Sequence, residues 1–310
     1  MAADLGFLEA LKGKRTVLTS HSLGDPDGLG AAFALKSYLG KASVVPADSI
    51  TALSRKLLEH AGLKLDEPCE RDALIVLDCN SRILMGRFST ANTYAVIDHH
   101  SAHSDPIESE HKFIDESYSS TCEIVYEYLR EKKFSLEPEI ALLLAAGIIL
   151  DSANFRNSHE RTFTYMGELL KLAEIEYKDL MGLLEMPRNL SQRMAVLKAC
   201  QRAKIDRQGD YLVATSRVNS FESYAAESLL ELGANVSFVG YAGRDARISA
   251  RTSLRLAPKV KLTDIMAEAG KLLGGSGGGH PGAAGATGPN ADRLDEALDL
   301  CSKLALQRLK

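Results

Sequence analysis

The chain has 310 residues, enough for two ordinary domains or one large one, and its 45% apolar and 25% charged residues are typical of a globular protein. The absence of any run of about 18 uninterrupted apolar residues excludes a membrane-spanning helix. The N-terminal residues also lack a secretory-signal pattern, so a cytoplasmic protein is expected. The formal net charge of -4 disfavours binding of long nucleic acid, because neutralising its phosphates usually requires an excess of Lys and Arg.

The first part of the chain alternates short apolar runs with helical patterns. Strands are expected at 15–20 and, more weakly, 43–47, and helices at about 27–39 and 53–62. The runs at 72–79 and 93–100 are almost continuously apolar, as in parallel strands that are buried on both faces. This βαβ rhythm predicts an α/β domain with a doubly wound, mainly parallel sheet.

Beyond about residue 119 the pattern becomes helical. The segment 119–133 places apolar residues at helical spacing behind a Ser/Thr cap. The segment 137–150 is apolar on most faces, which predicts a buried helix that ends at Asp151.

Pro, Asn and Ser gather in 185–191, which indicates a domain junction. We therefore expect an N-terminal domain at 1–186 and a smaller α+β domain at 187–310. For the second domain we predict helices at about 190–204, 221–232, 262–273 and 291–308, and strands near 210–217, 235–243 and 246–251. The Gly-rich segment 274–288 is too patterned to be a flexible linker.

Acidic and histidine side chains fall where predicted strands of the first domain end. The first strand is followed by His21, Asp25 and Asp27, the third ends at Asp78, and the fourth ends at Asp98, His99 and His100. Because ligands of open α/β sheets bind outside the carboxyl ends of the strands, we expect these side chains at one edge. Asp151 ends the apolar helix, where a buried carboxylate without a partner is strongly disfavoured and a metal ion would satisfy it.

Carboxylates and imidazoles without thiolates suit manganese best, with magnesium, cobalt or zinc as alternatives. Two ions that share a carboxylate would need more ligands than one ion, and six candidates suffice: His21, Asp25, Asp27, Asp78, His99 and Asp151. Two ions about 3.5–4 Å apart can activate a water and stabilise the attacking and leaving oxygens at phosphorus. Each motif alone has an ordinary structural reading, such as a helix cap at Asp25 or a surface His pair, but their coincidence at equivalent strand ends favours metal binding.

These motifs resemble the DHH phosphoesterase superfamily. The chain contains His21-x-x-x-Asp25-x-Asp27, Asp78, Asp98-His99-His100 and Asp151 in the family's order. The sequence SARTS at 249–253, followed by GGGHPGAAGA at 277–286, looks like the associated substrate-binding domain of the first type. The resemblance spans nearly the whole chain.

The resemblance implies that 1–186 is the catalytic domain, that 187–310 binds the substrate and that the active site lies in the cleft between them. It also implies a role for each motif residue. One metal would be held by His21, Asp25 and Asp78, and the second by Asp27, Asp78, His99 and Asp151, with Asp78 bridging. His100 would contact the scissile phosphate, and Asp98 would orient the histidine pair. The far end of the substrate would be held by Arg251, Gly277, Gly278, Gly279 and His280.

The implied function is two-metal hydrolysis of short oligonucleotides, dinucleotides or 3'-phosphoadenosine 5'-phosphate. One alternative is a RecJ-like single-strand exonuclease that acts with a repair partner, which would need a basic track. A non-catalytic nucleotide sensor is a third interpretation, but it requires lost ligands and all six are present. The sequence leaves open whether the chain forms a homodimer.

Overall fold

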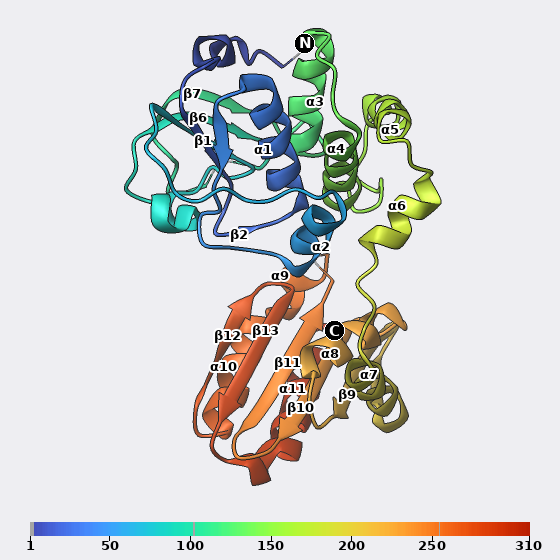
Figure 1. Ribbon diagram of the computed structural model, residues 1–310. Coiled ribbons are helices and arrows are strands. Elements are labelled where there is room, and N and C mark those ends of the chain that lie inside the picture. Colours follow the sequence, from blue (N-terminus) through green and yellow to red (C-terminus); the bar gives the residue numbers. More distant parts are fainter. Residues whose placement is uncertain (1–2, 102, 254) are drawn as a thin grey trace. The chain divides into compact units, whose positions relative to one another are not determined.

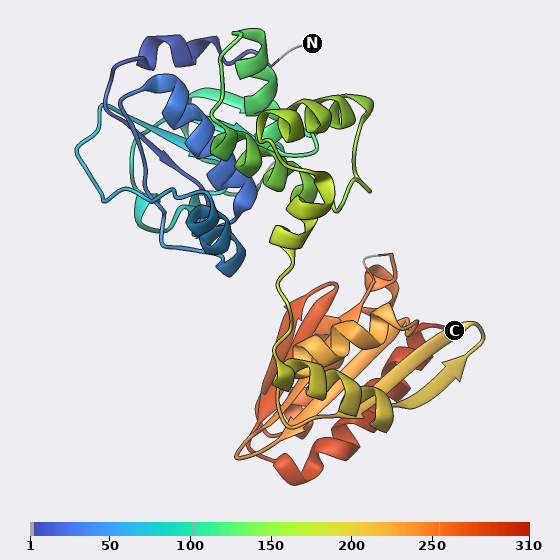
Figure 2. The same ribbon diagram turned by 45° about the vertical axis from the view of Figure 1, so that its right-hand side comes forward.

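The computed structural model describes residues 3–101, 103–253 and 255–310. The chain folds into two compact units, Met1–Met186 (unit 1) and Pro187–Lys310 (unit 2), which are drawn in Figures 1 and 2. Among the described residues, no helix combines the length and apolarity needed to cross a membrane.

Unit 1 is an α/β unit. Its strands are β1 (Thr16–Thr19), β2 (Leu23–Gly24), β3 (Ala42–Val44), β4 (Ser49–Ile50), β5 (Ala73–Leu77), β6 (Thr93–Asp98) and β7 (Ser109–Ile114). Its helices are α1 (Pro26–Leu39), α2 (Ala52–His60), α3 (Thr121–Glu131), α4 (Pro138–Asp151), α5 (Glu160–Leu172) and α6 (Tyr177–Leu184), with the short 3-10 helices η1 (Gly6–Leu11) and η2 (Arg82–Phe88).

The main sheet of unit 1 has the strand order β3-β1-β5-β6-β7, and every neighbouring pair is parallel. From β1 the chain crosses through α1 to β3 on one side and then returns to β5 on the other side. The strand order therefore reverses between β1 and β5, which is where open α/β sheets bind their ligands. The predicted doubly wound, mainly parallel sheet is confirmed.

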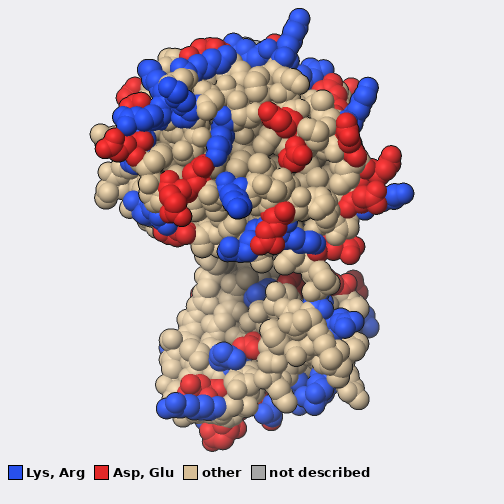
Figure 3. All heavy atoms as spheres, viewed as in Figure 1, with Lys and Arg blue, Asp and Glu red and all other residues tan. Residues whose placement is uncertain are grey.

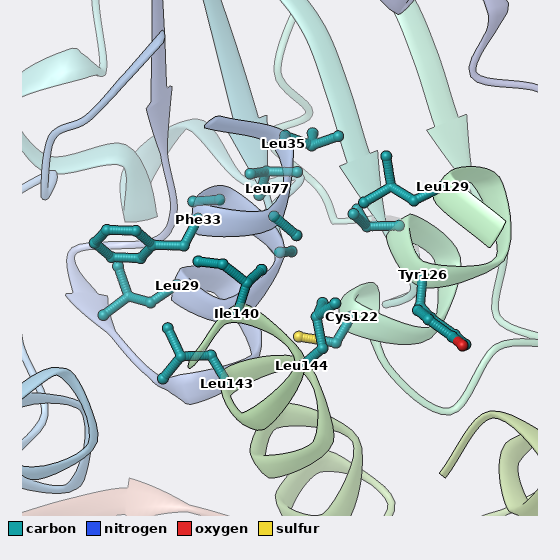
Figure 4. Packing of buried hydrophobic residues seen from close by; sticks show 14 of the residues in the cluster. Leu29, Phe33, Leu35, Leu77, Cys122, Tyr126, Leu129, Ile140, Leu143 and Leu144 are labelled. Carbon is teal, nitrogen blue, oxygen red and sulfur yellow. The ribbon is translucent and has the colours of Figure 1, made fainter. Parts of the chain in front are cut away.

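The two faces of this sheet are buried by different elements. On one face α1, α3 and α4 pack together, and Figure 4 shows Phe33 of α1, Cys122 of α3 and Leu143 of α4 within this core. On the other face Met85 and Phe88 of η2 pack with alternate residues of the strands. Burial on both faces explains why β5 is apolar at all of its positions.

Unit 2 is built on a mixed sheet with the strand order β12-β13-β11-β10-β9-β8, in which only the β9/β10 pair is parallel. Its strands are β8 (Lys204–Gln208), β9 (Tyr211–Arg217), β10 (Val236–Ala242), β11 (Ala246–Thr252), β12 (Ser276–His280) and β13 (Ala283–Gly288). Its helices are α7 (Leu190–Arg202), α8 (Glu222–Glu231), α9 (Ala257–Val260), α10 (Leu262–Leu272) and α11 (Leu294–Arg308), with the 3-10 helix η3 (Ala291–Arg293).

One face of the unit 2 sheet packs on α10 and α11, and α7 and α8 pack on the other face. Most of the Gly-rich segment belongs to this sheet as the hairpin β12–β13. The small side chains of this hairpin let its backbone lie against α10.

Candidate metal centre

The candidate metal ligands of unit 1 converge at the carboxyl ends of β1, β5 and β6. A first group consists of His21, Asp25 and Asp78, whose ligand atoms all lie within 4.8 Å of one another. His21 Nε2 is 3.5 Å from Asp25 Oδ2 and 3.9 Å from Asp78 Oδ2. Asp25 also caps α1, because its Oδ1 accepts hydrogen bonds from the amides of Asp27 and Gly28, each at 3.1 Å. Asp25 can therefore cap α1 and also offer an oxygen to a metal ion.

A second group consists of Asp78, His99, His100 and Asp151, and Asp78 belongs to both groups. Asp78 Oδ1 is 3.6 Å from His99 Nε2 and 3.5 Å from His100 Nδ1. Asp151 reaches the group from the end of α4, and its Oδ2 is 2.6 Å from His99 Nε2. Since one buried carboxylate connects the two groups, the arrangement can hold two neighbouring cations that share a ligand.

Asp78 is held in an unusual backbone conformation. It follows β5 with a φ of 57°, in the left-handed region that only Gly, Asn and Asp adopt readily. Its side chain is 2% exposed, and the hydroxyl of Thr121 donates a hydrogen bond to its Oδ1 at 3.1 Å. Strain of this kind collects at functional sites, where the surrounding structure compensates for it.

Asp27 lies beside these groups and belongs to neither of them. Its Oδ2 accepts a hydrogen bond from the Thr121 amide at 2.6 Å, and its Oδ1 accepts one from the Cys122 amide at 2.9 Å. The carboxylate therefore sits at the positive N-terminus of α3. A ligand role for Asp27 would use the remaining lone pairs of these oxygens and stays a prediction.

Packing between helices brings Asp27 close to α4. A Cβ atom at Gly147 would lie 2.9 Å from the Cα of Asp27 and 2.6 Å from the Sγ of Cys122. Glycine at this position is therefore needed for α4 to approach α1, and α4 carries Asp151 at its end.

The donor atoms of this cluster fit divalent cations. The carbonyl oxygen of Tyr118 lies 3.3 Å from the ring Nδ1 of His99 and can only accept a hydrogen bond, so Nδ1 carries a proton. The buried Nε2 faces the carboxylates and lies 2.6 Å from Asp151 Oδ2. Burial lowers the pKa of His99, but these carboxylates outweigh it and raise the pKa to about 9, so a proton on Nε2 stands where a divalent cation would bind.

The charges of the cluster also favour a bound divalent cation. Burial, together with the charges of Asp27, Asp25 and Asp151, raises the pKa of Asp78 well above its usual range. Burial and the charge of Asp151 raise the pKa of Asp27 to about 7. These carboxylates repel one another when all are ionised, and divalent cations would remove that repulsion.

Asp98 contacts both histidines of the motif, and the orienting role that the resemblance implies for it stays a prediction. It is fully buried, and its Oδ1 accepts hydrogen bonds from the amides of His99 and His100 and lies 2.9 Å from His100 Nδ1. This hydrogen bond raises the pKa of His100, whose side chain is 48% exposed. His100 can therefore present its Nε2 to a ligand in solvent while Asp98 holds its other nitrogen.

Three further residues contact the cluster and were not anticipated from the sequence. Tyr118 and Thr121 contact the candidate ligands directly, and Asn80 Nδ2 donates hydrogen bonds to the carbonyl oxygens of His100 and Ser101 at 3.2 and 3.1 Å. The only sequence signal near them was the Ser/Thr cap of α3, which is confirmed because Ser120 Oγ accepts a hydrogen bond from the amide of Glu123. The capping pattern does not reveal that this segment contacts β5 and β6.

In unit 2, Arg251 and His280 lie in one row across the sheet. Arg251 on β11 pairs with Ala283 on β13, which in turn pairs with His280 on β12. Directly paired residues of antiparallel strands point to the same face, so both polar side chains project from one face with a methyl group between them. Arg251 donates to the Ala250 carbonyl oxygen and forms no ion pair within the described residues.

The three glycines before His280 differ in their surroundings. A Cβ atom at Gly278 would meet nothing within 4 Å, and Gly278 shares the face of Arg251 and His280. A Cβ at Gly277 would lie 1.8 Å from the carbonyl oxygen of Met266 on α10. Gly279 has a φ of 140° and packs against β13. Only Gly278 of the three therefore offers open backbone to a ligand.

Comparison with known proteins places the chain in a family. Residues 15–148 match the model of the DHH family, N-terminal domain, and residues 216–306 match the DHHA1 domain. The chain is 30% identical over 324 residues to an uncharacterized protein of Methanocaldococcus jannaschii, covering 98% of each chain. It is 27% identical over 260 residues to the bifunctional oligoribonuclease and PAP phosphatase NrnA of Mycoplasma genitalium, covering 77% of this chain and 76% of that protein.

The fold is shared with a solved structure. The crystal structure of an exopolyphosphatase-related protein from Bacteroides fragilis superposes with a TM-score of 0.70 at 17% identity, over 98% of this chain and 97% of that chain. Fold and site thus define a metal-dependent hydrolase of phosphoric esters. The chain belongs to the DHH family and carries a DHHA1 domain at residues 216–306.

Proposed function

We propose that this protein hydrolyses phosphoester bonds in short oligonucleotides, dinucleotides or 3'-phosphoadenosine 5'-phosphate, with two divalent ions at the metal centre. The observation that carries the proposal is the pair of ligand groups joined by the buried Asp78. The similarity to an oligoribonuclease and PAP phosphatase over three quarters of the chain supports the substrate class. Mixed carboxylate and imidazole ligands favour Mn²⁺, and Mg²⁺ or Co²⁺ are the alternatives.

His21, Asp25, Asp27, Asp78, His99 and Asp151 are the proposed ligands. Bound divalent ions would lower the pKa of a water molecule and neutralise charge on the phosphoryl oxygens. His100 contacts the scissile phosphate in this proposal, because it is exposed and Asp98 fixes its ring. A protonated His100 donates a hydrogen bond from Nε2 to a phosphoryl oxygen or a proton to the leaving oxygen.

Unit 2 binds the remainder of the substrate in this proposal. The row of Arg251 and His280 supplies charge-assisted donors to a second phosphate, and the open backbone at Gly278 lets a sugar or base approach closely. Figure 3 shows few charged atoms over the area where Figure 1 places β12 and β13, as expected for a surface of Gly and Ala. A binding site with so few cations suits a short substrate.

The RecJ-like exonuclease alternative receives less support. On the face of unit 1 seen in Figure 3, Lys and Arg are interspersed with Asp and Glu. A long single strand is held by a continuous basic groove, and the net charge of -4 gives no excess of cations. We therefore propose a short nucleotide substrate rather than a long single strand.

A substrate panel tests this proposal. With Mn²⁺ present, we expect rapid cleavage of 3'-phosphoadenosine 5'-phosphate, linear dinucleotides or RNA of a few nucleotides, and rates that fall as the strand lengthens. Product analysis by ion-exchange chromatography measures each rate. Efficient digestion of long strands with no turnover of dinucleotides would instead establish the exonuclease, and binding without any turnover would establish the sensor.

Replacing Arg251 with Ala is expected to raise the KM for the best substrate by about ten- to a hundredfold, because a charge-assisted contact contributes roughly 1.5–3 kcal/mol. Mn²⁺ affinity should not change, since Arg251 belongs to unit 2 and the candidate ligands belong to unit 1. Steady-state kinetics and calorimetric titration with Mn²⁺ measure the two quantities. The matched control is Arg247→Ala on the same strand, whose side chain is engaged with Glu222 at 2.9 Å. An equal rise in KM for both variants would contradict the assignment.

A further inference from the structure

The segment Ser117–Thr121, which joins β7 to α3, contacts three of the candidate ligands. The Tyr118 carbonyl oxygen lies 3.3 Å from His99 Nδ1. At the end of the segment, the Thr121 hydroxyl donates a hydrogen bond to Asp78 and the Thr121 amide donates one to Asp27. The position of this segment therefore sets the ring orientation of His99 and the places of two carboxylates.

The same segment is held from its other side by a buried carboxylate. Glu123 is fully buried on α3, and its Oε2 accepts a hydrogen bond from the Ser119 amide at 2.7 Å. Its Oε1 accepts one from the Thr162 hydroxyl of α5 at 2.9 Å. A buried carboxylate needs a compensating cation, and Arg161 Nε lies 3.4 Å from the same Oε1.

Arg161 also contacts the segment directly. Its Nη2 donates to the carbonyl oxygen of Ser117 and lies 3.3 Å from the Ser117 hydroxyl. Its guanidinium carbon lies 3.9 Å from the centre of the Tyr118 ring, which is a close cation–π contact. A planar guanidinium can make these contacts at the same time, and a Lys ammonium cannot.

We propose that Arg161 is a positioning residue of the metal centre. It fixes Ser117–Thr121 against Glu123, so that Tyr118 orients His99 for coordination and Thr121 holds Asp78 and Asp27. The inference rests on the proposed metal site and adds a residue of α5 that lies outside every motif of the sequence. Partners that orient metal ligands typically change metal affinity about 10- to 100-fold when they are removed.

The experiment compares Arg161→Met and Arg161→Lys with Arg130→Met. Arg130 is the matched control because it also joins α3 to α5, through hydrogen bonds of 2.7 and 2.9 Å to Glu168 and a contact with the Tyr165 ring, and does not touch the segment. For each metal-free protein, Mn²⁺ affinity is measured by calorimetric titration and thermal unfolding by circular dichroism. Substrate KM and kcat are then measured over a range of Mn²⁺ concentrations.

We expect Arg161→Met to weaken Mn²⁺ binding at least tenfold, Arg161→Lys to weaken it less, and Arg130→Met to leave it unchanged. At saturating Mn²⁺, kcat and KM of the Arg161 variants should return towards the wild-type values, which a loss of folding would not allow.

Other outcomes would overturn the inference. Unchanged Mn²⁺ affinity with a KM that stays high at saturating metal would make Arg161 a substrate contact, as its 29% exposed side chain permits. If Arg161→Met and Arg130→Met weakened Mn²⁺ binding equally, Arg161 would contribute only to the general stability of unit 1. If Arg161→Met does not fold, the Arg161→Lys result decides between these readings. Failure of the wild-type chain to bind Mn²⁺ would instead refute the metal site itself.

Discussion

Replacing Asp78 with Asn is expected to abolish high-affinity Mn²⁺ binding and to leave the metal-free protein at least as stable as the wild type. Asp78 is the one residue shared by both ligand groups, so its loss removes the bridge between them. Asn suits the left-handed backbone at this position and keeps an oxygen that can accept the Thr121 hydroxyl. Turnover should fall by at least about 10²–10³-fold.

The metal-free Asp78→Asn variant is expected to be stable because the substitution removes a negative charge from a cluster of carboxylates. In the metal-free protein the buried Asp78 carboxylate faces the negative charges of Asp25, Asp27 and Asp151. A neutral amide relieves that repulsion, as is common where a functional site is kept at the expense of stability. Thermal unfolding in EDTA measures the effect, and added Mn²⁺ should raise the unfolding temperature of the wild type only.

Asp72→Asn is the matched control for Asp78→Asn. Asp72 precedes the opposite end of β5 and forms an ion pair with Arg15 at 2.8 Å. This control should lose a little stability and keep wild-type Mn²⁺ affinity. An Asp78→Asn variant that retained normal Mn²⁺ affinity would show that the two groups do not form one metal centre.

The second large effect is expected from Gly277, which should not tolerate a side chain. A Cβ atom there would lie 1.8 Å from the carbonyl oxygen and 2.4 Å from the carbonyl carbon of Met266, both of which belong to the backbone of α10. Backbone cannot move aside as a flexible side chain can, so Gly277→Ala should lower the free energy of unfolding of unit 2 by about 3 kcal/mol or more. Urea denaturation, with hydrogen exchange of α10 to locate the change, measures it.

Gly278→Ala is the neighbouring control with the opposite expectation. A Cβ at Gly278 meets no atom within 4 Å, so the fold should keep its stability while the new methyl group enters the space beside Arg251 and His280. The KM for the substrate should then rise several-fold with kcat little changed. If Gly278→Ala destabilised unit 2 as much as Gly277→Ala, the open face assigned to this row would be wrong.

Hydrophobic periodicity predicted the parts of the fold that are buried. The strands β1, β5 and β6 are apolar because both faces of the sheet are covered, and the acidic motifs follow them directly. Since the carboxyl ends of parallel strands meet at one edge, the convergence of His21, Asp78 and His99 could be predicted without coordinates. The structure brings these three residues together.

The edge strands β7 and β8 and the Gly-rich hairpin were not predicted. The strand β7 alternates between exposed and half-exposed residues and contains several polar ones, so its sequence resembles a surface loop. Three of the five residues of β12 are glycine, which has low strand propensity. The segment is a strand because it pairs with β13 and lies against α10. In both cases tertiary contacts decide the structure, and local sequence does not report them.

The contacts around the candidate ligands could not be predicted from the sequence either. Thr121 lies 43 positions from Asp78 and 94 from Asp27, and no local pattern links such distant residues. Arg161 looks like an ordinary polar residue of an amphipathic helix until α5 is packed on α3. His111 lies in β7, and its ring stacks on that of Phe7 with 4.9 Å between the ring centroids, a contact that no local pattern indicates.

The spread of the ligand groups along the chain has a kinetic consequence. Their members run from His21 to Asp151, so a complete ligand set does not exist until β1, β5, β6 and α4 have come together. We therefore expect Mn²⁺ to leave the folding rate of unit 1 nearly unchanged, because a partly folded chain lacks the complete ligand set. A bound ion would have to be released whenever those elements separate. We therefore expect Mn²⁺ to slow the unfolding of unit 1.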